Sequence, residues 1–159
     1  MKGRMSEPDT PSPRIAAFMA HWESLRPAPD LLPGRQHFDP VHIPWALPNL
    51  WLVEVGPGDP RRYRIRLVGG VLVESGFIGR PGMYMDDPRL SPDPSEVMKL
   101  FDGIVDSGRP NWRRGRAIVD HVKFVDTIER AMMPLAADGR HVDMVLSMTI
   151  FHWQDGRST

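Results

Sequence analysis

The segment from Val142 to Phe151 carries the most regular pattern in the sequence. Apolar and polar side chains alternate along most of its length. The apolar set is Val142, Met144, Leu146, Met148 and Ile150, and the polar set is Asp143, Ser147 and Thr149. Successive side chains of a strand point to opposite faces of its sheet, so this period of two predicts a β-strand with one buried face. The chain is therefore expected to build its core against a sheet.

Four more segments are expected to join this sheet. Residues 50–55 and 63–67 lie on either side of a Gly-Pro-Gly-Asp turn signal, which predicts an antiparallel hairpin. Residues 112–119 and 127–135 also have strand-like composition, and an Asp-Gly turn at 138–139 leads from them into the last strand. Together these patterns predict a hairpin and a three-stranded meander.

A helix is expected before the first strand. Ser12 can cap it, and Pro13 suits the first helical position because the N–H it lacks would be unpaired there. Apolar side chains then recur at three- and four-residue spacing and share one face, which comprises Ile15, Phe18, Met19, Trp22 and Leu25. Aromatic residues and Met are enriched in interface cores, so Phe18, Met19, Trp22 and Leu25 are candidates for a homodimer interface. Packing of this face within the chain is the alternative.

A second, longer helix is expected between the second and third strands. Asp93 can cap it, Pro94 takes the first helical position, and Glu96 completes a capping box. It should run to about Ser107 and end at Gly108 in a left-handed conformation. The glycine-rich stretch before this helix predicts short helical turns joined by tight bends.

Length and composition fit one globular domain. Of 159 residues, 41% are hydrophobic and 25% are charged, and the formal net charge is zero. We predict an α+β fold, a five-stranded antiparallel sheet with helices on one face and an N-terminal amphipathic helix. The expected limits are a flexible arm at 1–12, the domain at 13–153 and a flexible tail at 154–159. No signal-peptide core and no apolar run of ~20 residues is present, so a cytoplasmic protein without membrane contact is expected.

The order of these elements and several short motifs resemble the PAS superfamily, in particular a small single-domain alphaproteobacterial PAS-like family. The motifs are LPGR (32–35), FDP (38–40), LPNLWL (47–52), YRIRLVG (63–69), ER (129–130), MPL (133–135) and VDMVL (142–146). The resemblance covers about residues 14–151. It implies a sensory or regulatory signalling module that binds a small molecule, a protein partner or both, and that is not an enzyme.

The same resemblance implies a small-molecule site between the sheet and its helices. The apolar candidates for its lining are Val97, Phe101, Ile104, Met133, Leu146 and Met148. Simple filling of the core is the alternative. The absence of cysteine excludes a cysteinyl flavin, and the absence of histidine from residues 94–107 argues against haem. The cofactor stays unknown, with a noncovalent flavin or an organic metabolite open.

Metal binding and catalysis have weaker support. The six histidines contain no HxxxH or HExxH pair, so no metal site is expected. Asp86 and Asp87 beside Tyr84 could form an acid/base pair, although Asp-Asp-Pro is also a common loop sequence. The competing function is a small α+β enzyme with a cone-like pocket of the isomerase type. Such an enzyme would hold a carboxylate of raised pKa inside its pocket.

Two strand segments are rich in arginine. The first contains Arg62, Arg64 and Arg66, and the second contains Arg113, Arg114 and Arg116. If the two segments are adjacent in the sheet, Arg64, Arg66, Arg114 and Arg116 would form an anion-binding surface for phosphate, RNA or an acidic protein. Zero net charge argues against nucleic acid as the partner, and solvated surface arginines are the alternative.

Overall fold

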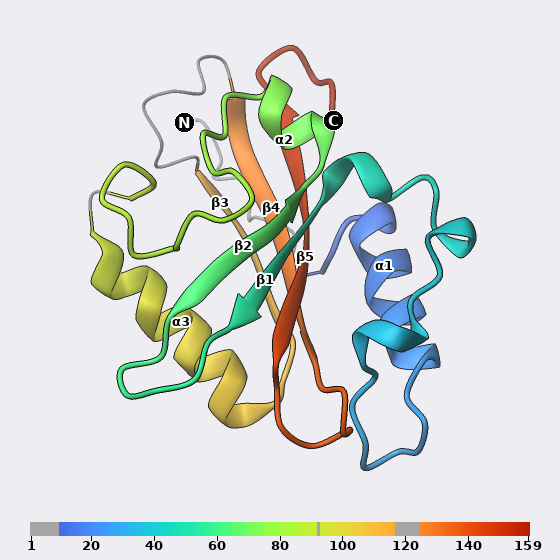
Figure 1. The fold of residues 1–159 in the computed structure, drawn as a ribbon. Coiled ribbons are helices and arrows are strands. Elements are labelled where there is room, and N and C mark those ends of the chain that lie inside the picture. Colours follow the sequence, from blue (N-terminus) through green and yellow to red (C-terminus); the bar gives the residue numbers. More distant parts are fainter. Residues whose placement is uncertain (1–9, 92, 117–124) are drawn as a thin grey trace, which may run out of the picture.

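A computed structural model describes residues 10–91, 93–116 and 125–159, and its strands form one sheet (Figure 1). The strands are β1 (Leu50–Val55), β2 (Tyr63–Val68), β3 (Asn111–Arg116), β4 (Val125–Leu135) and β5 (Met144–Trp153). Their order across the sheet is β2-β1-β5-β4-β3, and every neighbouring pair is antiparallel. The predicted α+β class with a five-stranded antiparallel sheet is confirmed.

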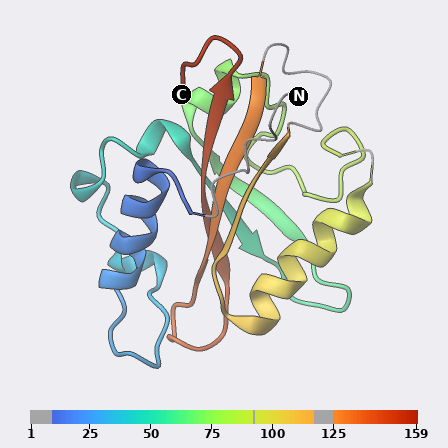
Figure 2. The same cartoon turned by 180° about the vertical axis from the view of Figure 1, so that it is seen from behind.

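The helices divide between the two faces of this sheet. α1 (Pro13–Ser24) packs on one face, and α2 (Gly70–Glu74) and α3 (Pro94–Ser107) pack on the other. Figures 1 and 2 show α1 and α3 on opposite sides of the strands. Three short 3-10 helices, Arg35–His37, Pro40–His42 and Leu47–Asn49, lie between α1 and β1. The sheet therefore has two covered faces.

Both long helices begin at the expected prolines, but two predicted side-chain caps are absent: the side chain of Ser12 makes no capping hydrogen bond, and Glu96 forms no capping box. Pro13 and Pro94 open α1 and α3, and the side chain of Asp93 accepts a hydrogen bond from the backbone N–H of Ser95. α3 ends before Gly108, whose φ of +63° lies in the left-handed region that favours glycine. The carboxylate of Glu96 instead forms a surface ion pair at 3.3 Å with the ammonium group of Lys99, which lies three residues further along the same helix.

Each face of the sheet has its own core. Under α1 the buried residues include Ile15, Phe18, Trp22, Ala131, Met133, Leu146, Met148 and Ile150. Under α3 they include Val53, Ile65, Phe101, Ile104, Met132, Val145 and Phe151. In β5 the even-numbered side chains from 146 to 150 face α1, as the alternation predicted. Val145 and Phe151 face α3, so the second face of this strand is buried as well.

The β2 edge of the sheet is partly covered by the chain itself. The backbone N–H of Ile65 donates to the carbonyl of Met83, and that of Met85 donates to the carbonyl of Tyr63, both at 2.8 Å. These bonds satisfy groups that an edge strand would otherwise leave open to another chain.

The C-terminal residues, predicted as a flexible tail, fold back on β5. Phe151 and Thr159 exchange two backbone hydrogen bonds of 2.8 and 3.0 Å, and the indole N–H of Trp153 donates to the hydroxyl of Thr159 at 2.9 Å. Gly156, with φ of +85°, allows the reversal that makes this pairing possible.

Parts of two predictions fall outside the described residues. They are residues 1–9 of the expected arm and residues 117–119 of the expected third strand. Across 10–91, 93–116 and 125–159, no helix has the length and apolar character needed to cross a bilayer.

Candidate functional site

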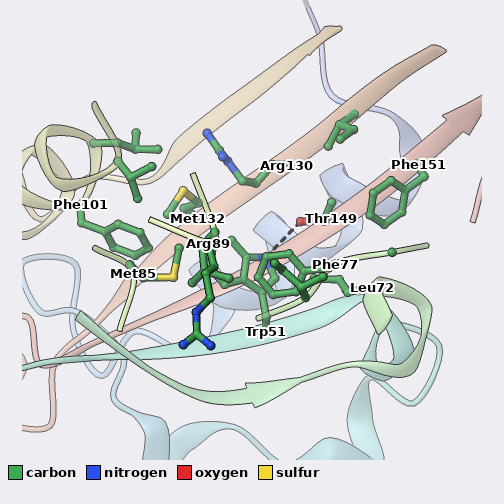
Figure 3. Close-up of a pocket in the computed structure, with 16 residues that line it drawn as sticks. Trp51, Leu72, Phe77, Met85, Arg89, Phe101, Arg130, Met132, Thr149 and Phe151 are labelled. Atoms are coloured by element: carbon green, nitrogen blue, oxygen red, sulfur yellow. Dashed lines mark hydrogen bonds between the residues drawn. The ribbon is translucent and has the colours of Figure 1, made fainter. Parts of the chain in front are cut away.

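A cavity of about 190 Å³ lies between the sheet and the elements that cover its α3 face (Figure 3). The strands β1, β4 and β5 form its floor with Trp51, Ile128, Arg130, Met132, Thr149 and Phe151. α2, α3 and the chain between them form its roof with Leu72, Phe77, Met85, Leu90, Val97, Leu100 and Phe101. Most of these side chains are apolar, so the cavity favours an apolar occupant.

Trp51 is the central aromatic residue of the floor. Its ring meets that of Phe101 edge to face at 6.3 Å between centroids and lies 6.2 Å from that of Phe77. Its indole N–H donates a 3.0 Å hydrogen bond to the hydroxyl oxygen of Thr149, drawn as the dashed line in Figure 3. The ring is thus held both by aromatic packing and by a buried hydrogen bond, which gives the floor a defined shape.

A polar row crosses the otherwise apolar floor. Arg113 of β3 is the register partner of Arg130 of β4, and Arg130 is the register partner of Thr149 of β5. Directly opposed residues of antiparallel strands place their side chains on the same face. Arg130 and Thr149 line the cavity, so the row Arg113–Arg130–Thr149 runs from the β3 edge of the sheet into the cavity.

Arg130 carries a charge that the described residues do not balance. Its Nε is buried without a hydrogen-bond partner, and no carboxylate of the described ranges forms an ion pair with it. Burial, and after it the positive charge of Arg113, lower the pKa of Arg130 from its ordinary value. An arginine nevertheless stays protonated at neutral pH, so the cavity contains a permanent positive charge.

The second arginine of the cavity, Arg89, is already paired. Its Nη2 lies 2.6 Å from Oδ2 of Asp87, and its Nε donates to the same carboxylate. The hydrogen bonds from Arg89 lower the pKa of Asp87 to about 2. In Figure 3 the side chains of Arg89 and Arg130 extend in opposite directions. Arg89 therefore adds little net charge beside Arg130.

The six residues predicted to line a pocket are split between the two faces of the sheet. Val97 and Phe101 line the cavity, and Ile104 packs in the same core without lining it. Met133, Leu146 and Met148 lie on the opposite face, under α1. The reason for the separation is the period of two: Met132 and Met133 are equally apolar neighbours, but only Met132 faces the cavity.

The residues predicted to form a dimer interface pack within the chain. Phe18 and Trp22 are buried against the sheet, and the indole N–H of Trp22 donates to the carbonyl of Pro134 at 2.9 Å. Met19 and Leu25 are half-buried against the same core. Phe18 and Trp22 are therefore not available to a second subunit in this fold.

The arginines predicted to form one basic surface lie at opposite edges of the sheet. β2, with Arg64 and Arg66, is one edge strand, and β3, with Arg114 and Arg116, is the other. Both arginines of β2 pair with Glu54 of β1, at 3.0 and 3.1 Å. The strand order thus separates the two sets of arginines, so the predicted single basic surface does not form. The order of strands in a sheet cannot be read from the residues next to each arginine in the sequence.

The most buried carboxylate, that of Glu129, lies on the α1 face and not in the cavity. It accepts hydrogen bonds from the backbone N–H of Ser12 at 2.7 Å and from the indole of Trp112 at 3.1 Å, and Nε2 of His152 lies 3.1 Å away. Burial alone would raise the pKa of Glu129, but these hydrogen bonds outweigh it and lower the pKa.

Other titratable groups are paired outside the cavity lining. Asp86 lies 3.4 Å from Arg62, whose guanidinium stacks over the ring of Tyr84 at 3.6 Å. The hydroxyl of Tyr63 donates to Asp102, and burial together with this hydrogen bond raises the pKa of Tyr63. Among the described residues, no group of three or more His, Asp or Glu side chains could hold a metal ion.

Arg130 was missed at the sequence level, although a signal for it exists. Ile128, Arg130 and Met132 share one face of β4, and Glu129, Ala131 and Met133 share the other. A single charge between apolar neighbours on each face of a strand buried on both sides marks two specific polar sites.

No family model, curated protein or solved structure matches this chain.

Proposed function

We propose that this chain is a PAS-like regulatory module that holds a small molecule between its sheet and α3 and passes that binding to a signalling partner. The observation that carries the proposal is the apolar cavity of about 190 Å³ on the α3 face. An apolar cavity of similar size, about 150 Å³, accepts benzene in another protein. The order of elements on which the PAS resemblance rests supports the same conclusion.

The side chains of the cavity favour binding over catalysis. Its titratable lining residues within the described ranges are Arg89 and Arg130. A guanidinium is protonated at neutral pH and cannot act as a general base. An isomerase-type enzyme would need a carboxylate, His or Tyr in contact with its substrate, and Glu129 lies on the other face of the sheet.

Native mass spectrometry of the purified protein, with a visible absorption spectrum, tests this function. A small-molecule adduct or a chromophore is expected, and its mass identifies the ligand. The variant Val97→Trp fills the cavity from α3 and should abolish the adduct. The matched control Val41→Trp changes a side chain that is 77% exposed and outside the cavity, so it should retain the adduct.

An adduct that survives Val97→Trp would contradict the cavity as the ligand site. A protein that carries no adduct and gains none when incubated with toluene would move the proposal from ligand sensing to protein docking. The same spectra report whether the chain forms the homodimer that we also propose, which would need a surface other than the buried face of α1.

A further inference from the structure

The described residues that line the cavity present hydrogen-bond donors and include no carboxylate, and Asp87, the partner of Arg89, is not among them. The guanidinium of Arg130 offers several N–H groups, and its Nε has no partner among the described residues. The hydroxyl oxygen of Thr149 already accepts from Trp51, so its own hydrogen is free to be donated to a ligand. Two donors on neighbouring strands thus face the same space, as expected of a site that binds an acceptor.

The two positive charges of the polar row, on Arg113 and Arg130, also favour the binding of an anion. Arg113 and Arg130 are directly opposed on β3 and β4, and like charges in this position destabilise a sheet. Within the described ranges neither side chain has a carboxylate partner. A bound anion would relieve the repulsion and satisfy the buried Nε, which is costly to leave unpaired.

The size and lining of the cavity limit what can carry that anion. A volume of about 190 Å³ suits one aromatic ring with a short substituent. The rings of Trp51, Phe77, Phe101 and Phe151 form much of the wall, and aromatic pairs gain energy beyond the area they bury. A single unpaired guanidinium inside the cavity balances one negative charge, so a monoanion matches better than a doubly charged phosphate.

We propose that the cavity binds a small aromatic monocarboxylate, with its ring among Trp51, Phe101 and Phe151 and its carboxylate on Arg130 and Thr149. This inference rests on the proposed ligand-binding function and names the chemical class of the ligand. Arg113 acts at a longer range, because it lies beyond Arg130 in the row and is exposed. It should raise the affinity for anions without touching the ligand.

Isothermal titration with phenylacetate and with phenylacetamide tests the inference, because the two probes have nearly the same shape and only the first is charged. Phenylacetate should bind at least about tenfold more tightly, as expected for a charge-assisted hydrogen bond in a cavity. Arg130→Met should remove this preference by weakening phenylacetate alone. Arg130→Lys should restore part of it, because the charge returns without the planar fork.

Two further variants keep the result interpretable. Arg113→Gln, at an exposed position, should weaken phenylacetate by a few-fold and leave phenylacetamide unchanged. Arg116→Gln removes an exposed arginine of the same strand on the other face, by strand alternation, and should change neither affinity.

The outcomes distinguish the proposed ligand class, an aromatic monocarboxylate, from the more general proposal that the cavity binds a small molecule. Equal affinities for the two probes, unchanged in Arg130→Met, would overturn the monocarboxylate and leave the cavity as a site for neutral apolar ligands. Failure of both probes to bind at millimolar concentration would overturn the monocarboxylate and the small-molecule function together. Preference for hexanoate over phenylacetate, abolished by Arg130→Met, would overturn the aromatic part and keep the anion site.

Discussion

Arg113 of β3 lies directly opposite Arg130 of β4, on the face of the sheet that forms the cavity floor. Two cations in register on neighbouring strands are unfavourable, and Arg130 is in addition half-buried, with its Nε inaccessible to water. The described residues provide no counter-charge for either side chain. The pair therefore costs stability in the empty protein, which is typical of positions kept for binding.

Replacing Arg130 should stabilise the empty protein. We expect Arg130→Met to raise the free energy of unfolding by about 1 kcal/mol, because an apolar side chain takes the same place without a half-buried, unpaired charge. Urea denaturation followed by tryptophan fluorescence measures the change. Arg116→Met, at an exposed position of β3, is the control and should lie within about 0.5 kcal/mol of the unchanged protein. A clear loss of stability in Arg130→Met would contradict the absence of a counter-charge.

The hydrogen bond between Trp51 and Thr149 should contribute measurably to stability. Thr149→Val removes the acceptor and leaves the buried indole N–H unpaired, which should lower the free energy of unfolding by about 1–3 kcal/mol. Thr127→Val is a matched control in β4, because the buried hydroxyl of Thr127 has no partner among the described residues. That control should be neutral or slightly stabilising. Similar losses of unfolding free energy in the two variants would show that the hydrogen bond between Trp51 and Thr149 does not contribute to stability.

Glu129 should make stability depend on pH. Its pKa in the folded protein is lowered from the ordinary value of 4.5, so the folded state favours the charged form. The resulting stabilisation is complete at neutral pH and is lost as pH falls below about 4.5 towards the folded pKa.

The variant Glu129→Gln should therefore cost about 1–3 kcal/mol at neutral pH and flatten the acid side of the stability curve. Thermal unfolding between about pH 3 and pH 7 measures both effects. Glu96→Gln, which alters an exposed ion pair with Lys99, is the control and should leave the acid slope unchanged. An acid slope that survives Glu129→Gln would assign the pH dependence to other carboxylates.

Phe18 should act through the core of its own chain. Phe18→Ala should lower the free energy of unfolding by about 3–5 kcal/mol, because it opens a space between α1 and the sheet. The control Val41→Ala changes an exposed side chain and should cost less than about 0.5 kcal/mol. Sedimentation should find the same oligomeric state in both variants. Loss of a dimer without loss of stability in Phe18→Ala would return this face to the interface role predicted from its sequence.

Local signals in the sequence were enough to predict the two long helices and the five strands of the fold. Pro13, Asp93 with Pro94, and Gly108 act through the backbone of their own segment, so they mark the start of α1 and both ends of α3 without knowledge of the rest. The strand bounds agree with prediction to within two residues wherever both ends are described, because the period of two is likewise local.

The site depended on relationships that local signals do not carry. Met132 and Met133 are alike in the sequence, and only the placement of α1 and α3 on opposite faces decides which of them meets the cavity. The strand order separates Arg64 from Arg114 and brings Arg130 beside Arg113 and Thr149. Such pairings arise from register between distant segments, which no short window of sequence contains.

The methionines of this chain allow the most direct measurement of the central claim, that a small molecule enters between the sheet and α3. Met85 and Met132 line the cavity, whereas Met133 and Met148 lie under α1 on the other face. We expect phenylacetate to shift the methyl NMR signals of Met85 and Met132 in a saturable manner and to leave those of Met133 and Met148 in place. Shifts confined to Met133 and Met148, or no saturable shift of any of the four, would contradict the cavity as the ligand site.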